Sequence, residues 1–260
     1  MLRLADIGIR LVDRDIKIFG EIDRWRVIQG RHIKELAGFS GQRACDRRLR
    51  KLIQAGYIKR ERILYGVAGI YLNTSKAQIK KGALAKSRKI RVEQIHHDIA
   101  VVDTAIFFNK VYEIEFDDMK TEIELHRLDG FGIRKHRPDF VFTDRSNSID
   151  LYGNSKLEGL NGNPRVRRHE ILTAINPENK NGKPKLVCVE VELSLKARDR
   201  FEKIIRDNFR AYDRQIWIVP DMDSKIARIL MNNKTAYTNI EIMELSEIQA
   251  VVQDGTQADV

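Results

Sequence analysis

Two segments in the second half of the chain constrain its fold most, because each places carboxylates on a strand that is otherwise apolar. The first reads His-Arg-Pro-Asp-Phe-Val-Phe from His136 to Phe142, and the second reads Leu-Val-Cys-Val-Glu-Val-Glu from Leu186 to Glu192. Removing a carboxylate from water is costly unless it is paired or holds a cation. Two such strands therefore favour a centre that holds a hard metal ion. The pattern leaves open the alternative that these acids lie at strand ends, in water.

Length and composition place the chain among ordinary soluble proteins with one or two hydrophobic cores. It has 260 residues, of which 42% are apolar and 32% are charged. No apolar run approaches the roughly 20 residues of a membrane span, and the N-terminus lacks the basic, apolar and small-residue order of a signal peptide. We therefore expect a cytoplasmic protein without a membrane partner. Cys45 and Cys188 have no neighbouring Cys or His at metal-ligand spacing, so buried free thiols are expected instead of a disulfide or a zinc site.

Positive charge is concentrated in the first third of the chain. Residues 1–75 contain 16 Lys and Arg against 8 Asp and Glu, and residues 76–91 add 7 basic residues and no acid. The first 91 residues therefore carry a net charge of +15, whereas the remaining 169 carry −5 within a total of +10. This asymmetry predicts an N-terminal part that contacts a polyanion and a C-terminal part with a different task. A solvated basic surface without a partner is the alternative.

Residues 13–55 predict three helices with helix-turn-helix spacing. The first helix spans residues 13–29 and is closed by Gly30, the second spans residues 31–37, and the third runs from an N-cap at Ser40 to about residue 55. The first helix is expected to bury one apolar face, made of Ile16, Phe19, Ile22 and Ile28.

The third predicted helix has two faces of opposite character. Its expected buried side contains Cys45, Leu49, Leu52 and Ile53, and its opposite side contains Gln42, Arg43, Asp46, Arg47 and Arg50 at helical steps of three and four. A helix with a packed back and an arginine-rich front is typical of a helix that reads the DNA major groove. We therefore expect double-stranded DNA as a partner, contacted by Gln42, Arg43, Arg47, Arg50, Lys51, Arg60 and Arg62.

Two short strands are expected after the third helix, over residues 57–63 and 65–72. The segment from Leu49 to Arg60, a helix ending in Leu-Ile-x-Ala-Gly-Tyr-Ile and followed by basic residues, resembles the winged-helix superfamily. This resemblance implies a winged helix-turn-helix domain over residues 10–75, although some winged helices bind proteins instead of DNA. Residues 76–91 are expected to form a basic linker helix that follows phosphates and adds affinity without sequence choice.

The C-terminal part predicts an α/β domain with a mixed sheet over residues 92–250. The expected helices cover residues 92–108, 198–212 and 224–233, and the expected strands cover residues 112–116, 121–125, 137–142, 186–193, 215–219 and 240–245. Residues 145–184 are rich in turn residues and predict a mobile insertion, with a contact to DNA or a partner as the alternative. The tail from residue 253 is expected to fray.

The order helix, strands, Pro-Asp strand, Glu-bearing strand, helix, strand resembles the PD-(D/E)xK nuclease-like superfamily. The residues that carry the resemblance are Pro138-Asp139 and Glu190-Val191-Glu192. It implies that Asp139 and Glu190 hold a divalent cation, Mg²⁺ or Mn²⁺, which polarises phosphate and activates the attacking water.

This chain departs from the superfamily at the position of the catalytic lysine, where it has Glu192. A carboxylate cannot supply the positive charge that a lysine provides. The resemblance therefore implies either that Lys196 or Lys203 takes that role from the strand end or the following helix, or that the site has weak or no nuclease activity.

A basic winged helix followed by Pro-Asp and Glu-x-acid strands is similar to the replication-relaxation family of plasmids and mobile elements, and to mobilisation accessory proteins that assist a relaxase. This resemblance implies a DNA-binding accessory protein at a mobilisation or replication origin, associated with the bacterial nucleoid or a plasmid. It implies a relaxase or a replication initiator as partner and leaves a homodimer open. Two alternatives remain: a winged-helix transcription regulator whose C-terminal domain dimerises or senses a ligand, and a metal-dependent DNA endonuclease.

Overall fold

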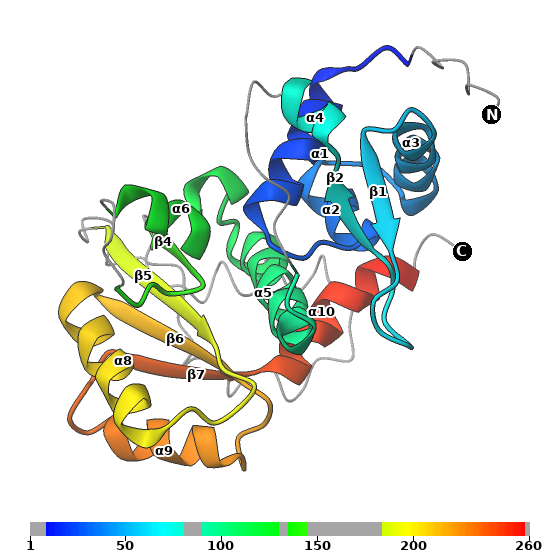
Figure 1. The fold of residues 1–260 in the computed structure, drawn as a ribbon. Helices are drawn as coiled ribbons and strands as arrows, with labels where there is room; N and C mark the ends of the chain where they lie inside the picture. Colours follow the sequence, from blue (N-terminus) through cyan, green and yellow to red (C-terminus); the bar gives the residue numbers. More distant parts are fainter. Residues whose placement is uncertain (1–8, 81–89, 130–134, 145–183, 258–260) are drawn as a thin grey trace. The chain divides into compact units, whose positions relative to one another are not determined.

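The chain divides into two compact units (Figure 1). The N-terminal unit comprises Met1–Ile106 together with Ile248–Val260, and the C-terminal unit comprises Phe107–Glu247. The computed structural model describes residues 9–80, 90–129, 135–144 and 184–257. None of the helices within these ranges combines the length and the apolar character needed to cross a membrane.

Three helices followed by a hairpin form the first part of the N-terminal unit. In chain order they are α1 (Asp13–Arg24), α2 (Gly30–Leu36), α3 (Gln42–Gln54), β1 (Ile58–Glu61) and β2 (Ile70–Asn73). The two strands pair antiparallel. The unit continues with α4 (Ser75–Lys80), the short 3-10 helix η1 (Val92–Gln94), the first part of α5 (Ile95–Tyr112) and most of α10 (Leu245–Gln257).

The core of the N-terminal unit is built from one face of each of the first three helices. Its fully buried or nearly buried side chains there are Ile18, Phe19, Ile22, Ile33, Leu36, Cys45, Leu49 and Leu52. Phe19 of α1 stacks on Tyr57, just before β1, with ring centroids 5.7 Å apart. The turns on either side of α3 use Gly38 with φ 66° and Gly56 with φ 75°, a left-handed backbone conformation that favours glycine. These two glycines therefore fix where α2 and α3 end.

The first helix differs from the prediction in its end and in its buried face. α1 ends at Arg24, and Gly30 begins α2 instead of closing the first helix. Ile16 is exposed, whereas Asp15 is fully buried. The reason is an ion pair with α3, in which Arg48 Nε donates to Asp15 Oδ1 at 2.7 Å. An ion pair between α1 and α3 therefore occupies part of the buried face of α1, where the periodicity predicted an apolar side chain.

The segments around α3 also differ in detail from the prediction. Gly41, not Ser40, is the N-cap residue of α3. Both strands of the hairpin are shorter than expected. The linker helix predicted over residues 76–91 corresponds to α4 as far as Lys80, and residues 81–89 lie outside the described residues.

A mixed five-stranded sheet organises the C-terminal unit, which confirms the predicted α/β class. The strand order is β3-β4-β5-β6-β7; β4 is antiparallel to both of its neighbours, and β5, β6 and β7 run parallel. The elements are η2 (Phe116–Asp118), β3 (Lys120–Thr121), α6 (Glu122–Leu128), β4 (Phe140–Asp144), β5 (Lys185–Val191), α8 (Arg198–Ala211), β6 (Arg214–Val219), α9 (Lys225–Asn233) and β7 (Ile240–Glu244).

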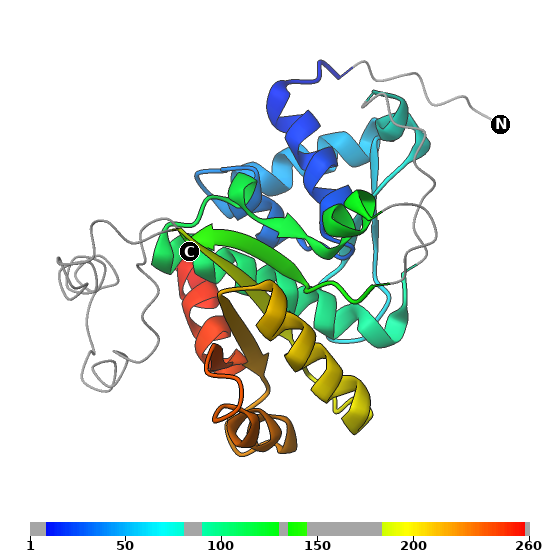
Figure 2. The same cartoon turned by 90° about the vertical axis from the view of Figure 1, so that its left-hand side faces the viewer.

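Helices α8 and α9 cover one face of this sheet, and α8 runs alongside the strands in both views (Figures 1 and 2). They share a cluster with β6 and β7 in which Phe201 packs edge-on against Trp217, with ring centroids 5.1 Å apart. On β4, Phe142 contacts Phe108 of α5 at a centroid distance of 5.3 Å. The sheet therefore buries both faces, as its apolar strands predict.

Two predicted strands of the C-terminal unit are wrong. Residues 112–116 contain the end of α5 and the start of η2, and residues 121–125 belong mostly to α6. The cause in the second case is a capping box: the Thr121 hydroxyl accepts from the Glu124 N–H, and Glu124 Oε2 accepts from the Thr121 N–H at 2.8 Å. Two reciprocal hydrogen bonds satisfy donors that only a helix start leaves open.

The remaining expectations have mixed outcomes. The predicted strands and helices from β5 to β7 are confirmed to within a few residues. Cys45 and Cys188 are free and buried, as expected. α10 extends to Gln257, into the tail for which fraying is predicted, and residues 258–260 lie outside the described residues. The predicted insertion, apart from Pro184 at its end, lies outside the described residues.

Candidate nucleic-acid interface and carboxylate site

The exposed face of α3 carries three arginines. Arg43, Arg47 and Arg50 are exposed at helical steps of three and four, so they lie along one side of the helix. On the opposite side, Cys45 and Leu49 are buried, and burial raises the pKa of the Cys45 thiol to about 12. The back of α3 is thus a chemically inert packing face, while its front presents guanidinium groups to solvent.

Further basic side chains extend from α3 to the hairpin. Lys51, Lys59, Arg60 and Arg62 are all exposed. The Arg60 guanidinium lies over the Tyr71 ring, 5.9 Å from its centroid. Gln42, also predicted to contact DNA, is half-buried and donates from Nε2 to Asp46 Oδ1 at 2.8 Å. All seven predicted contact residues therefore lie on α3, β1 or the residue after β1, with Gln42 less available than the arginines.

A buried polar network in the N-terminal unit, formed by Arg31, His32 and Asp103, was not predicted from the sequence. Asp103 of α5 is fully buried and accepts three hydrogen bonds: from Arg31 Nη1 at 2.5 Å, from Arg31 Nη2 at 2.9 Å and from His32 Nε2 at 3.0 Å. His32 Nδ1 accepts from the Gln29 N–H at 3.2 Å, so Nε2 carries the ring proton. Burial lowers the pKa of His32 below its ordinary value and keeps the imidazole neutral. Burial also acts to raise the pKa of Asp103, but the hydrogen bonds from His32 and Arg31 outweigh it and lower the pKa.

This network joins α2, the helix before α3, to α5 within the N-terminal unit. An aspartate and a histidine at apolar positions of two helices are the sequence signal that could have revealed it. The periodicity of a helix does not reveal such positions, because polar residues are usually exposed.

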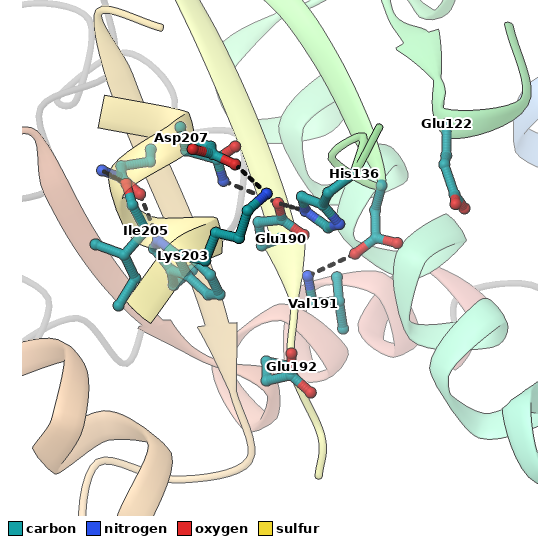
Figure 3. Close-up of polar contacts among 12 residues, drawn as sticks. Glu122, His136, Glu190, Val191, Glu192, Lys203, Ile205 and Asp207 are labelled. Atoms are coloured by element: carbon teal, nitrogen blue, oxygen red, sulfur yellow. Dashed lines mark hydrogen bonds and ion pairs between the residues drawn. The ribbon is translucent and has the colours of Figure 1, made fainter. Parts of the chain in front are cut away.

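In the C-terminal unit, the structure brings Asp139 and Glu190 to adjacent strands. The Asp139 N–H donates to the Val189 carbonyl at 3.1 Å, and Asp139 Oδ2 accepts from the Val191 N–H at 2.8 Å (Figure 3). Asp139 therefore lies immediately before β4 and clamps the backbone of β5. Residues 190 and 192 are two apart around the end of β5, so their side chains lie on the same side of the sheet.

Glu190 is held by two donors that the sequence analysis did not assign. Its Oε1 lies 2.7 Å from His136 Nε2 and accepts from Asn208 Nδ2 of α8 at 2.8 Å (Figure 3). Glu190 is only 3% exposed, so these two contacts satisfy a carboxylate that is almost removed from water. Burial acts to lower the pKa of His136, but the hydrogen bond and charge of Glu190 outweigh it and raise the pKa above its ordinary value.

The two lysines considered for the catalytic role lie in different surroundings. Lys196 forms an ion pair with Glu192, four residues earlier in the chain. Lys203 of α8 pairs instead with Asp207 at 3.0 Å, and its side chain is 65% exposed. Burial raises the pKa of Glu192, and the Lys196 ammonium counteracts this shift. Lys196 is therefore the lysine that accompanies the carboxylates, but Glu192 already engages its charge.

The arrangement does not fit a preformed divalent-cation site. Glu190 and Glu192 are engaged by protein donors, and Asp139 is bonded to the β5 backbone. Within the described ranges, no group of three or more His, Cys, Asp or Glu side chains is placed to hold a metal ion. Each of these carboxylates is therefore already bonded to a group of the protein itself.

Comparisons with known proteins assign the chain to no family. No protein-family model, curated protein or solved structure matches the chain.

Proposed function

We propose that this protein binds double-stranded DNA through α3 and the β1–β2 hairpin. The observation that carries the proposal is the exposed line of Arg43, Arg47 and Arg50 on a helix whose other side is buried. A helix of this kind can enter the major groove without disturbing its own packing. Arginine forms bidentate hydrogen bonds with guanine, and each good pair contributes roughly 1–3 kcal/mol of discrimination between bases.

The hairpin supports the same proposal. Three helices followed by two antiparallel strands is the element order expected of a winged helix-turn-helix domain. Exposed Lys59, Arg60 and Arg62 lie on or directly after β1, where they supply phosphate contacts that position the domain on the duplex. The net charge of +15 on the first 91 residues favours the same polyanion.

A role as an accessory protein at a plasmid or mobile-element origin follows from the resemblance carried by Pro138-Asp139 and Glu190-Val191-Glu192. The order α5, β3, α6, β4, β5, α8, β6, in which a helix separates the first two strands, supports a nuclease-like C-terminal unit in such a protein. Neighbouring genes for a relaxase or a replication initiator would favour this role, and an adjacent divergent promoter would favour a transcription regulator. Footprinting on the flanking DNA separates the two.

The DNA-binding proposal is tested by a triple substitution, Arg43→Ala, Arg47→Ala and Arg50→Ala, in the full chain. We expect duplex affinity to fall by a few kcal/mol. The dependence of log affinity on log salt should become shallower by about 0.9 for each DNA phosphate that the variant no longer neutralises. Fluorescence anisotropy at several salt concentrations measures both quantities.

The matched control removes three exposed basic residues of the C-terminal unit, Arg206, Lys225 and Arg228. It changes the net charge equally and should leave most of the affinity intact. Equal losses in the two triple variants, or an affinity of the α3 variant equal to wild type, would reject α3 as the DNA-contacting helix.

A metal-dependent endonuclease is the second candidate function. The observation that favours it is the adjacency of Asp139 and Glu190 at the junction of β4 and β5. The acid at position 192 and its ion pair with Lys196 count against strong activity.

A further inference from the structure

A pocket opens on the C-terminal unit between α6, the residues before β4, and α8. Its volume is about 520 Å³, which falls within the roughly 300–1,000 Å³ of small-molecule sites. His136 lines the pocket, with Lys203 and Asp207 of α8 on one side of it and Glu122 of α6 on the other (Figure 3). Buried Ile204 completes the wall on α8.

The described lining of this pocket is unusually basic. Four of the nine lining residues are Lys135, Arg137, Arg200 and Lys203, against two acids. Small-molecule pockets are lined mainly by apolar side chains with a few polar groups, but Ile204 is the one aliphatic side chain among these nine. Such a composition favours a small anion over an apolar ligand.

Within the part of the chain that the structure describes, two of these four basic side chains are already paired with an acid and two are not. Arg137 donates from Nε to Asp129 at 2.9 Å, and Lys203 pairs with Asp207. Lys135 and Arg200 are exposed, and among the described residues neither has an acidic partner. Two charges, one from the segment before β4 and one from α8, are therefore available to an incoming anion.

We propose that this pocket binds a phosphate group carried by a small phosphate ester. Phosphate oxygens accept charge-assisted hydrogen bonds from Arg and Lys, which are about twice as strong as bonds between neutral groups. The described lining contains no Phe, Tyr or Trp, so it lacks the aromatic platform on which nucleobases stack. The ligand is thus recognised through its phosphate. The pocket belongs to the C-terminal unit, and the proposal does not depend on DNA binding by α3.

The test compares two double variants of the full chain by isothermal titration calorimetry. The pocket variant is Lys135→Ala with Arg200→Ala, and the control is Arg206→Ala with Lys225→Ala, exposed residues that do not line the pocket. Both remove two positive charges from the C-terminal unit. Neither Lys135 nor Arg200 pairs with a described acid, so we expect the pocket variant to fold, as its circular dichroism spectrum and melting temperature would show.

Three ligands are titrated at constant ionic strength: inorganic phosphate, a 5′-mononucleotide with a phosphate monoester, and a dinucleoside monophosphate with only a diester. We expect wild type and control to bind at least one of them saturably, and the pocket variant to bind it about tenfold more weakly or worse. Preference for the mononucleotide or for inorganic phosphate supports a small ester bound through a terminal phosphate, whereas preference for the dinucleoside monophosphate overturns it in favour of a nucleic-acid backbone. Absence of saturable binding to all three ligands, or an equal loss in the control, overturns the proposal.

Discussion

At the scale of single residues, the C-terminal unit depends on polar side chains buried at the end of an apolar sheet. Glu190 is satisfied by His136 and Asn208, one from the segment before β4 and one from α8. Such a carboxylate is tolerated because both donors are in place, and removing one of them leaves a buried charge incompletely bonded.

The first prediction is that His136→Ala destabilises the protein by about 1.5–3 kcal/mol, the usual range for a hydrogen bond to a charged group. The pKa of His136 is raised in the folded state, so its stabilisation is complete below pH 6.5 and declines as the pH rises through the folded-state pKa. Urea denaturation of wild type and variant at a series of pH values measures the difference. His96→Ala, which removes an exposed imidazole, is the control, and a difference independent of pH would contradict the pKa assignment.

The second prediction concerns the pair Glu192 and Lys196. Because the folded-state pKa of Glu192 is raised, the folded protein loses stability as the pH rises from the ordinary carboxyl pKa through the folded-state value. Glu192→Gln avoids that loss and should melt at an equal or higher temperature at pH 7. Lys196→Ala removes the compensating charge and should lower the melting temperature. Differential scanning calorimetry decides, and a clear destabilisation by Glu192→Gln would show that the ion pair outweighs the cost of burial.

At the scale of elements, the contact of α2 with α5 determines how the helix preceding α3 is held. Arg31 and His32 both donate to Asp103, which is fully buried. Each of the three side chains depends on the others for its hydrogen bonds. We therefore expect the network to form or break as a unit, unlike the apolar contacts around it.

The third prediction is that Asp103→Ala destabilises the protein by about 3–5 kcal/mol, because it leaves the Arg31 charge and the buried His32 without their acceptor. Chemical denaturation measures the free energy of unfolding, with Glu93→Ala as a control for loss of an exposed acid near the start of α5. A change below about 1 kcal/mol would mean that Arg31 reaches solvent and that the network contributes little.

At the scale of the whole molecule, the net charge of +10 belongs to the N-terminal unit, whereas the C-terminal unit has as many acidic as basic residues. We expect cleavage of plasmid DNA by the full chain with Mg²⁺ or Mn²⁺ to be weak, because the acid at position 192 neutralises Lys196. Agarose gel assays with wild type and Asp139→Asn measure it. Strong cation-dependent cleavage that disappears in Asp139→Asn, with duplex binding retained, would contradict this expectation and favour the endonuclease.

Local signals determined much of the fold. The helices α8 and α9 and the apolar strands β5 and β6 were recognisable from the sequence, because each depends on neighbours within a few residues. The same reasoning separated the buried side of α3 from its arginine side. It also predicted Asp139 and Glu190 on two strands; β4 and β5 are adjacent, with Glu190 on β5 and Asp139 immediately before β4.

Tertiary structure decided what depended on partners far away in the chain. Asp15 and Asp103 became buried because Arg48 and Arg31 reach them from other helices, and no local pattern contains that information. His136 and Asn208 contact Glu190 only in the folded chain, because they lie 54 and 18 residues away from it in the sequence. A polar side chain is tolerated inside a protein only with a hydrogen-bonding or charged partner, and the tertiary structure determines whether such a partner lies within reach.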